Sequence, residues 1–273
     1  MAQPYSRLGF TSYNGRLLTE AQRARVEVVL VAPRNPLNVG AASRAMANFG
    51  FSQLTVVAPY APHWAEAKQS AVGASSVLDH AREAATLAEA IAQCTLVLGT
   101  GTLTYRKAEQ PVVALPDAGS LVISELQRGG HVAIVFGPEK RGLARDDLAL
   151  CHRLLVIPTD ARQPSMNLGQ AVAVCLYEIG ARPAKIAEAM QGSPGRIDFA
   201  PQPTNSGNLD RMASLIEEVM REAGYSPNAM QKANHHDLQL MLRRLELDQK
   251  DARRILGLFR RVLTHMKRPS TKK

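Results

Sequence analysis

Cysteine and aromatic residues are scarce in this chain of 273 residues, and long apolar runs are missing. The three cysteines, Cys94, Cys151 and Cys175, are odd in number, widely spaced and without a CxxC pair. This pattern argues against a disulfide framework and fits a reducing compartment. No stretch approaches the roughly 18 apolar residues of a membrane-spanning helix, and the N-terminus contains no apolar signal core. We therefore expect a cytoplasmic protein with no membrane partner.

The signatures of several common enzyme classes are also absent. No GxGxxG follows the first expected strand, so a standard dinucleotide site has no fingerprint. The stretch GPEKRG at 137–142 has the glycine spacing of a phosphate loop but lacks the Lys-Ser/Thr that must follow. Neither HExxH nor GxSxG occurs. The adjacent His235 and His236 have no third ligand nearby, so we expect surface histidines and no metal.

Positive charge is concentrated at the C-terminal end. The formal net charge is +9, and the stretch from Met241 to Lys273 contains eleven basic and three acidic residues, which leaves the preceding residues almost neutral. A polyanion is the first partner to consider for such a segment, and a solubilising tail is the alternative.

Apolar runs rich in β-branched residues alternate with helical patterns from residue 25 to residue 180. Buried strands are expected at 26–31, 54–58, 95–98, 132–136 and 154–157, with a short extended piece near 77–78. Helices are expected at 39–48, 64–70, 81–92, 120–127, 145–151 and 170–179. This alternation predicts an α/β fold, a mostly parallel sheet with helices on both faces.

The sequence pattern changes after residue 180. Prolines and glycines mark 181–208 as a linker, and 209–273 contains three helical patterns, at 209–222, 236–245 and 249–266. We therefore divide the chain into a peripheral segment 1–24, a domain 25–180, a linker 181–208 and a basic helical region 209–273. Asp248 is the expected N-cap of the last helix. Its basic residues form either a solvated face or an RNA-binding surface.

Three polar loops follow three of the expected strands, at 35–44, 136–143 and 157–168. The carboxyl ends of parallel strands meet at one edge of a sheet, where open α/β folds bind ligands. Arg44 lies two turns into an otherwise small and apolar helix, so its charge needs a partner or a ligand. The third loop read alone could be an ordinary connection in which Ser165 or Asn167 caps the next helix.

The motifs of these loops, NxxNxGAxxR, FGxExxGL and IP…SxNL, resemble those of the SPOUT methyltransferases of the SpoU/TrmH branch, which methylate ribose 2′-hydroxyls in RNA. The resemblance covers about 26–179. Two further features narrow the resemblance to TrmJ-type tRNA (cytidine/uridine-2′-O)-methyltransferases. One is the stretch Gly99–Thr102 with Arg106, and the other is a helical extension with the segments 224–227 and 242–245. The chain departs from the family at Pro164 and Met166, where a Ser-Ser-Leu-Asn type of run is more usual.

The resemblance implies a SPOUT domain with a C-terminal deep trefoil knot, a small all-helical C-terminal extension, and a homodimer with composite active sites. It also implies S-adenosyl-L-methionine (S-adenosylmethionine) as the cofactor and tRNA, not DNA, as the partner. By family analogy the target is the first nucleotide of the anticodon loop, position 32. Alternatives are an rRNA 2′-O-methyltransferase of the same family and a non-catalytic RNA-binding knot protein.

Carried over residue by residue, the resemblance assigns catalytic positions to Asn38, Arg44, Glu139, Ser165 and Asn167. The cofactor pocket is expected to contain Thr100, Gly101, Thr102, Gly137, Ile157, Ser165, Met166 and Asn167. RNA contacts are expected from Arg34, Arg44, Arg253, Arg254, Arg260, Arg261, Lys267 and Arg268. No metal is expected.

Arg44 is a poor general base, because a guanidinium keeps its proton to a pH above about 12. We expect Arg44 to clamp the target phosphate or the ribose 2′-oxygen and to stabilise the developing alkoxide, while the proton leaves through phosphate or water. Glu139 is expected to orient Arg44 or a loop N–H group instead of acting as the base.

Overall fold

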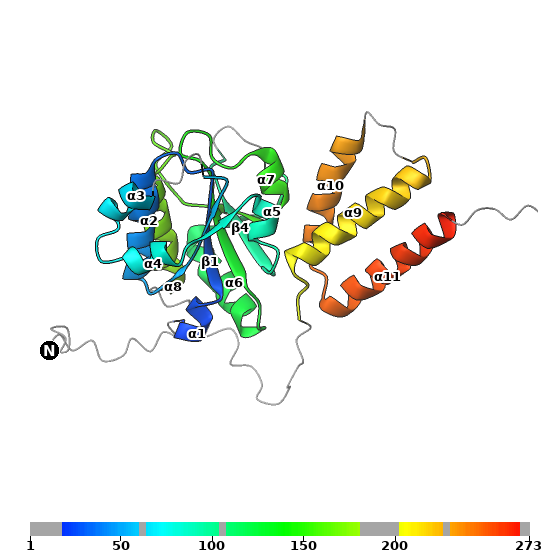
Figure 1. Ribbon diagram of the computed structural model, residues 1–273, viewed down its shortest axis with the longest axis horizontal. Helices are drawn as coiled ribbons and strands as arrows, with labels where there is room; N and C mark the ends of the chain where they lie inside the picture. The colour runs from blue at the N-terminus through cyan, green and yellow to red at the C-terminus, as the bar shows by residue number, and fades with distance from the viewer. Residues whose placement is uncertain (1–17, 60–63, 104–107, 181–201, 226–229, 268–273) are drawn as a thin grey trace, which may run out of the picture.

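The computed structural model describes residues 18–59, 64–103, 108–180, 202–225 and 230–267 (Figure 1). Within these ranges seven strands form a single sheet in the order β3-β2-β1-β6-β4-β7-β5, and every pairing is parallel. The strands are β1 Val26–Val31, β2 Gln53–Val57, β3 Arg82–Ala84, β4 Leu96–Thr100, β5 Val112–Ala114, β6 Val132–Phe136 and β7 Arg153–Val156. The predicted parallel sheet is confirmed.

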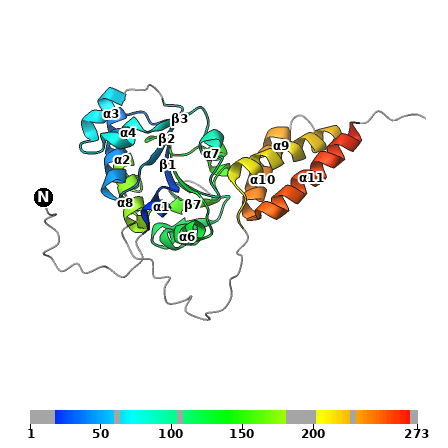
Figure 2. The ribbon, with the colours of Figure 1, turned by 60° about the horizontal axis from the view of Figure 1, so that its bottom comes forward.

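Helices cover both faces of this sheet (Figure 2). The helices of this part of the chain are α1 Glu20–Arg23, α2 Pro36–Asn48, α3 Trp64–Ser70, α4 Ser75–Asp79, α5 Leu87–Ala90, α6 Leu115–Gln127, α7 Arg145–Ala149 and α8 Leu168–Gly180. The helices α2, α3, α4, α6 and α8 share one apolar core with the sheet, and α5 and α7 share the other. None of the helices in the described ranges combines the length and apolar character that a membrane crossing needs.

The central strands are apolar on both sides because both faces are covered. In β1, Val28 and Leu30 belong to the core under α2 and α8, whereas Val29 belongs to the core under α5 and α7. Strands buried on both faces read as continuous apolar runs, which explains why these strands were readable from the sequence.

Two predictions in the region 75–92 are wrong. The piece near 77–78 is part of helix α4, and the helix expected at 81–92 is divided into strand β3 and the short helix α5. The side chain of Thr86 accepts a hydrogen bond from the N–H of Glu89 at 3.2 Å and so starts α5 there. Strand β3 has only three residues and exists by pairing with β2, which helical periodicity cannot register. The sequence also missed β5, a three-residue edge strand.

A second group of helices follows, α9 Ser206–Glu222, α10 Gln231–Arg244 and α11 Gln249–Met266. In Figure 1, α9 (yellow) lies between α10 and α11, and it packs against both. Asp248 caps α11 as predicted, since its carboxylate accepts a hydrogen bond from the N–H of Asp251 at 2.7 Å. The small core is made of Leu209, Met212, Ala213, Leu242, Ala252 and Leu256.

The helical region begins three residues earlier than predicted. Residues 206–208, assigned to the linker, begin α9, because Asn205 caps that helix through the N–H of Asn208. The segment 181–201 lies outside the described residues, as do residues 1–17 of the predicted peripheral segment. The described part of that segment is not wholly peripheral, since Leu18 is buried.

The helical region is joined to the sheet domain by specific contacts. The backbone and side chain of Ser206 both donate to the carbonyl oxygen of Cys94, at 2.8 and 2.9 Å. Inside the helical region, Arg243 is only 1% exposed and donates to Asp210 on α9 at 2.8 Å. A buried guanidinium requires a partner of opposite charge, so this ion pair fixes the position of α10 on α9.

Gly40 offers a test of the packing between α2 and α3. A Cβ atom at Gly40 would lie 2.0 Å from the carbonyl oxygen of Ala67, a backbone atom that cannot move aside freely. We expect Gly40→Ala to lower the free energy of unfolding by about 1 to 3 kcal/mol, measured by urea denaturation.

The matched control is Gly257→Ala in α11. Nothing lies within 4 Å of the added Cβ atom at this exposed helical position. Alanine is the better helix former, so this variant should be as stable as the wild type or more stable by up to about 1 kcal/mol. A neutral Gly40→Ala would contradict the close packing of α2 on α3.

Candidate functional site

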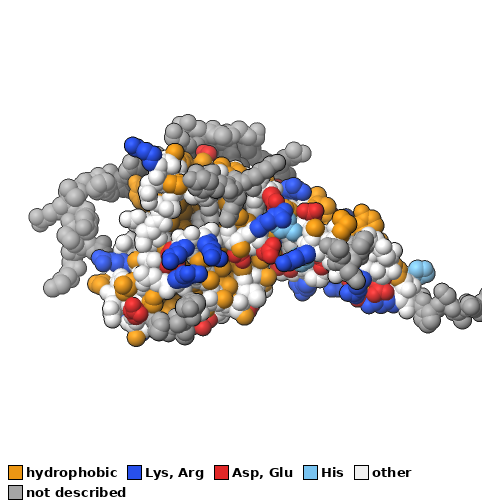
Figure 3. Space-filling view, turned by 90° about the horizontal axis from the view of Figure 1, so that it is seen from above, with side chains coloured by type: hydrophobic (Ala, Val, Ile, Leu, Met, Phe, Trp, Pro, Cys, Tyr) orange, Lys and Arg blue, Asp and Glu red, His pale blue; other side chains and the backbone are white. Residues whose placement is uncertain are grey.

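The three polar loops meet at the carboxyl edge of the sheet, the edge viewed in Figure 3. Glu139, in the loop after β6, reaches across to the loop after β1. Its carboxylate accepts hydrogen bonds from the N–H groups of Arg34 and Asn35, at 3.2 and 3.3 Å, and from Nδ2 of Asn38 at 2.8 Å. The side chain of Asn35 also caps α2, through the N–H of Leu37. Glu139 therefore orients loop N–H groups, one of its two predicted roles.

Asn38 carries the connection on to the third loop. Its Oδ1 accepts a hydrogen bond from Nδ2 of Asn167 at 2.9 Å. Oδ1 of Asn167 accepts in turn from the N–H groups of Gly169 and Gln170, at 2.9 and 3.4 Å. Asn167 is therefore the predicted cap of α8, and one chain of hydrogen bonds joins all three motifs.

A pocket of about 470 Å³ opens beside this network. Its volume lies within the range of small-molecule sites, about 300 to 1,000 Å³. Seven of the eight predicted cofactor residues line it, namely Thr100, Gly101, Thr102, Gly137, Ile157, Ser165 and Met166. Asn167 does not, and this prediction needs correction. Its amide group is occupied by the hydrogen bonds to Asn38 and to the first turn of α8.

A further set of lining residues was not predicted from the sequence: Phe136, Pro138, Lys140, Arg141, Gly142, Leu143, Thr159, Pro164, Leu168 and Ala171. Glu139, predicted as catalytic, also lines the pocket. Nine of the ten lie in two of the three motif loops, 136–143 and 157–168. The motifs identify these loops in the sequence. They do not show which side of each loop faces the cavity.

Gly137 is where the pocket wall folds back on itself. A Cβ atom there would lie 2.2 Å from the backbone nitrogen of Leu143 and 2.3 Å from the carbonyl carbon of Gly142. Gly142 itself has φ +64°, a conformation that favours glycine. The two glycines allow the loop after β6 to bring its backbone groups to the pocket surface.

Glu139 is held in its charged form. Partial burial raises the pKa of its carboxyl, but the hydrogen bonds from Asn38 and from the loop N–H groups outweigh this effect and leave the pKa below the ordinary value. A carboxylate with a low pKa and three donors is a weak proton acceptor. Its position suits the orientation of the loops better than proton abstraction.

Arg44 lies on α2 with its side chain exposed, and it is not among the residues that line the pocket. No ion pair or hydrogen bond joins it to another part of the chain that the structure describes, so Glu139 does not orient it. Its charge therefore faces solvent instead of being buried in the apolar helix.

Other basic side chains lie in the motif loops, two of them at the pocket itself. Lys140 and Arg141 are exposed lining residues, and Arg34 is exposed on the neighbouring loop. Arg162 is held by Asp160 through two hydrogen bonds of 2.9 and 3.0 Å. Figure 3 shows Lys and Arg side chains (blue) gathered on this face of the sheet domain, and others towards the helices.

The predicted basic face of α11 lies on the surface. Arg253, Arg254, Arg260 and Arg261 are exposed, and Lys267 is paired with Glu218 at 2.5 Å. Three sequence features lie outside the described residues: Arg268, predicted to bind RNA, Arg106, and the segment 226–227.

The expectation of two surface histidines is wrong for one of them. His235 is exposed and contacts Glu217, but His236 is 6% exposed and its Nε2 lies 2.5 Å from Oε2 of Glu109. The distant Glu109 supplies the partner that buries His236, and sequence spacing cannot show such a contact. Groups of three or more potential metal ligands do not occur among the residues described.

Comparison with known proteins identifies the architecture around this pocket. The model of the SpoU rRNA Methylase family matches residues 25–177, which run from β1 into α8 and include all three motif loops. The chain belongs to the SpoU methylase family. The predicted family is thereby confirmed.

The similarity of this SpoU chain to TrmJ proteins extends past the matched domain. It is 38% identical over 174 residues to tRNA (cytidine/uridine/adenosine-2′-O-)-methyltransferase TrmJ of Pseudomonas aeruginosa, covering 64% of this chain and 66% of that protein. It is 30% identical over 244 residues to tRNA (cytidine/uridine-2′-O-)-methyltransferase TrmJ of Yersinia pestis, covering 89% and 91%. The crystal structure of TrmJ from Z. mobilis ZM4 has a TM-score of 0.74 and 31% identity, covering 86% and 98%.

The low pKa of Glu139 predicts how the stability of the SpoU domain depends on pH. Because the folded pKa lies below the ordinary value of 4.5, the charged carboxylate stabilises the fold above that pH. This contribution is lost as the pH falls through the folded pKa. We expect the stability advantage of the wild type over Glu139→Gln to be constant near neutral pH and to shrink below about pH 4.5, in urea titrations.

Asp147 provides a control of opposite sign. Burial raises the pKa of its carboxyl above the ordinary value. The stability of the wild type relative to Asp147→Asn should therefore rise as the pH falls over the same range. A Glu139→Gln difference that stays flat in acid would mean that the network does not hold the carboxylate in its charged form.

Proposed function

We propose that this chain is a methyltransferase that uses S-adenosylmethionine to methylate a ribose 2′-hydroxyl in tRNA. The observation that carries the proposal is the hydrogen-bonded chain Glu139–Asn38–Asn167, which brings the three SpoU motifs together beside one pocket. The tRNA substrate is supported by the TrmJ relatives, whose names describe tRNA 2′-O-methyltransferases.

The pocket fits S-adenosylmethionine in size and in chemistry. At Gly137 a side chain would clash with the pocket's own backbone, so ligand atoms can approach main-chain groups closely. Leu143, Ile157 and Leu168 supply an apolar wall for an adenine ring, and Thr100 and Thr102 add hydroxyl groups. When bound, the cofactor supplies an electrophilic sulfonium methyl group. The chain would hold it through backbone groups of the loops after β4, β6 and β7.

The protein must position a weak nucleophile. A ribose 2′-hydroxyl reacts only when it is oriented and partly deprotonated, and orientation alone can remove about 7 to 11 kcal/mol of a barrier. Glu139 and Asn167 are engaged with Asn38 and the loop backbone, so we assign them to holding the loops. Ser165 is exposed at the pocket and is free to contact the ribose or the cofactor.

We assign the clamp on the target phosphate or 2′-oxygen to Arg44. Its exposed guanidinium can make bidentate contacts with oxyanions and would stabilise the developing alkoxide. Because it lies away from the pocket of its own chain, the proposal includes a homodimer in which Arg44 completes the site of the partner. The neighbouring surface of α2 and α8 supports this, since Leu37 and Tyr177 are 40% and 49% exposed there.

Family membership supports two finer features of the fold. One is a deep trefoil knot formed by the loop 157–167 and α8, which packs against α2. The other is the division of labour between the domain 25–180 and the basic helical region that starts at Ser206. A cytoplasmic location follows from a tRNA substrate. Within tRNA, family analogy points to the first nucleotide of the anticodon loop.

The function is tested by methylation of tRNA isolated from a strain that lacks this gene. Full-length protein and labelled S-adenosylmethionine are added, and the product is mapped by nuclease digestion and mass spectrometry. We expect one new 2′-O-methyl group in the anticodon loop. Methylation of rRNA alone would favour the rRNA alternative, and cofactor binding without methyl transfer to either RNA would contradict the proposed activity.

Arg44→Lys tests the clamp. Lysine keeps the charge but loses the planar fork of donors, so we expect turnover to fall at least about tenfold while tRNA affinity stays within about twofold. Turnover and affinity are measured by single-turnover methylation and filter binding. Near-full turnover in Arg44→Lys would show that bidentate geometry is irrelevant to the reaction.

We assign tRNA backbone binding to the exposed face of α11. The double variant Arg260→Gln/Arg261→Gln should weaken tRNA binding and reduce the slope of log affinity against log salt by about 2, because each phosphate contact contributes about 0.9. The control is Lys68→Gln, which removes a lysine paired with Asp79 at 2.7 Å and should leave the slope unchanged. An unchanged slope in the double variant would place the RNA elsewhere.

A further inference from the structure

Glu109 lies outside the three motif loops, in a segment that contacts both α7 and α10. Its carboxylate accepts hydrogen bonds from Arg145 of α7, with Nη2 at 2.7 Å and Nε at 3.2 and 3.3 Å. Its Oε2 also lies 2.5 Å from Nε2 of His236 on α10. One carboxylate thus joins the sheet domain to the helical region.

Arg145 lies close in the sequence to the pocket wall. It is the first residue of α7, two positions after Leu143, which lines the cavity and folds back against Gly137. Gln110, next to Glu109, donates to the carbonyl oxygen of Leu148 at 2.5 Å and fixes the same segment to α7 a second time. The position of α7, and with it the pocket wall at 142–143, is therefore tied to Glu109.

His236 makes the connection on the other side. It is 6% exposed, although its neighbours His235 and Asp237 on α10 are exposed. Its second ring nitrogen, Nδ1, is 3.9 Å from Asp146 of α7. Since the catalytic proposal uses neither His236 nor Glu109, the burial of His236 and its pairing with Glu109 call for a separate explanation.

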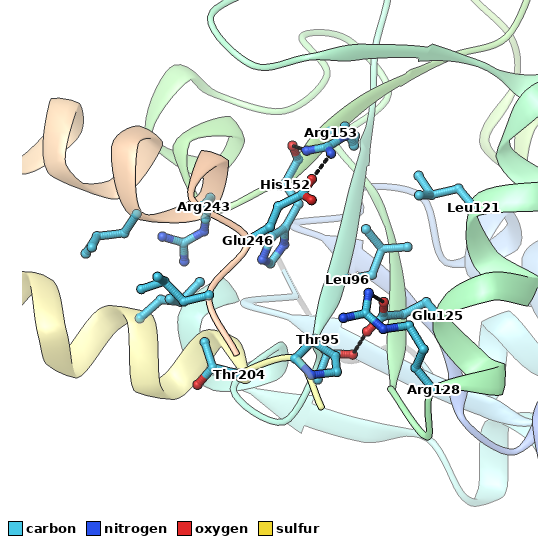
Figure 4. Close-up of a pocket in the computed structure, with 14 residues that line it drawn as sticks. Thr95, Leu96, Leu121, Glu125, Arg128, His152, Arg153, Thr204, Arg243 and Glu246 are labelled. Carbon is cyan, nitrogen blue, oxygen red and sulfur yellow. Dashed lines mark hydrogen bonds and ion pairs between the residues drawn. The ribbon is translucent and has the colours of Figure 1, made fainter. Parts of the chain in front are cut away.

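A second ion pair joins the same two regions without reaching the pocket. Arg153 of β7 pairs with Glu246, which follows α10, at the seam shown in Figure 4. This seam is lined by residues such as Thr95 and His152, none of which lines the cofactor pocket. Each glutamate therefore takes part in one contact between the sheet domain and α10 or its end, and of the two only Glu109 pairs with Arg145, next to the pocket wall at 142–143.

We propose that Glu109 is a positioning residue that couples RNA bound on the helical region to the cofactor pocket. This inference rests on the proposed function. RNA bound on α11 constrains α9 and, through it, α10, since both helices pack against α9. The constraint passes from α10 to Glu109, α7 and the pocket wall, so the cofactor then binds to a pocket that is already ordered. By linkage, the cofactor must raise the affinity for RNA by the same factor.

The test measures this factor in the full-length protein. S-Adenosylhomocysteine is titrated calorimetrically into the protein alone and in the presence of saturating tRNA from a strain that lacks this gene. We expect tRNA to tighten binding at least about fivefold in the wild type, the lower end of typical coupling. In Glu109→Gln the factor should fall below about twofold, while the affinity measured without tRNA stays unchanged.

Glu246→Gln is the matched control, because it makes the same chemical change in the other inter-region ion pair and should keep the wild-type factor. His236 gives an independent pair of variants: His236→Gln retains a donor for Glu109 and should keep most of the coupling, whereas His236→Leu should lose it. Thermal unfolding of each variant verifies that it is folded.

Equal affinity with and without tRNA in the wild type would overturn the inference, as would an equal loss of coupling in Glu246→Gln. Both results are distinguishable from a failure of the proposed function. A wild-type protein that methylates tRNA without any coupling contradicts only the role of Glu109. A protein that methylates no tRNA contradicts the proposed function itself.

Discussion

The hydrogen bonds of one carboxylate hold the candidate site together. Glu139 accepts from two N–H groups of the loop after β1 and from Asn38, and Asn38 accepts from Asn167 at the start of α8. Without this connection the three motif loops would be ordinary connections at a sheet edge. With it, the loops after β6 and β7 are held beside the loop after β4, and these three loops line a cavity large enough for a nucleoside-sized ligand.

The network requires the sheet beneath it. Strands β1 and β6 are hydrogen-bonded neighbours, and β7 is separated from β6 only by β4, so parallel pairing delivers the three loops to one edge. The strands are rigid because both faces are buried, by α2 and α8 on one side and by α5 and α7 on the other. Close backbone contacts at glycines, such as Gly137 against Leu143, then define the shape of the pocket above the strands.

The helical region adds charge and a second set of constraints. Its outer surface presents the arginines of α11, and its inner surface is fixed to the sheet domain through Ser206, His236 and Glu246. These contacts fix the helical region to the sheet domain at three separate points.

The sequence by itself determined the parallel α/β fold, the family and the three motif loops, and it named seven of the residues that line the pocket. Buried parallel strands leave continuous apolar runs, and ligand loops leave short motifs in fixed order, so both are local signals. Only the tertiary structure decided the contacts between residues far apart in the chain. In the fold, Asn167 donates a hydrogen bond to Asn38 and does not line the pocket, and Arg44 faces solvent. Strands β3 and β5 form by pairing at the edges of the sheet, and His236 is buried against Glu109. Each of these outcomes depends on residues far away in the sequence. A local sequence pattern cannot identify them, because only the folded chain brings them close.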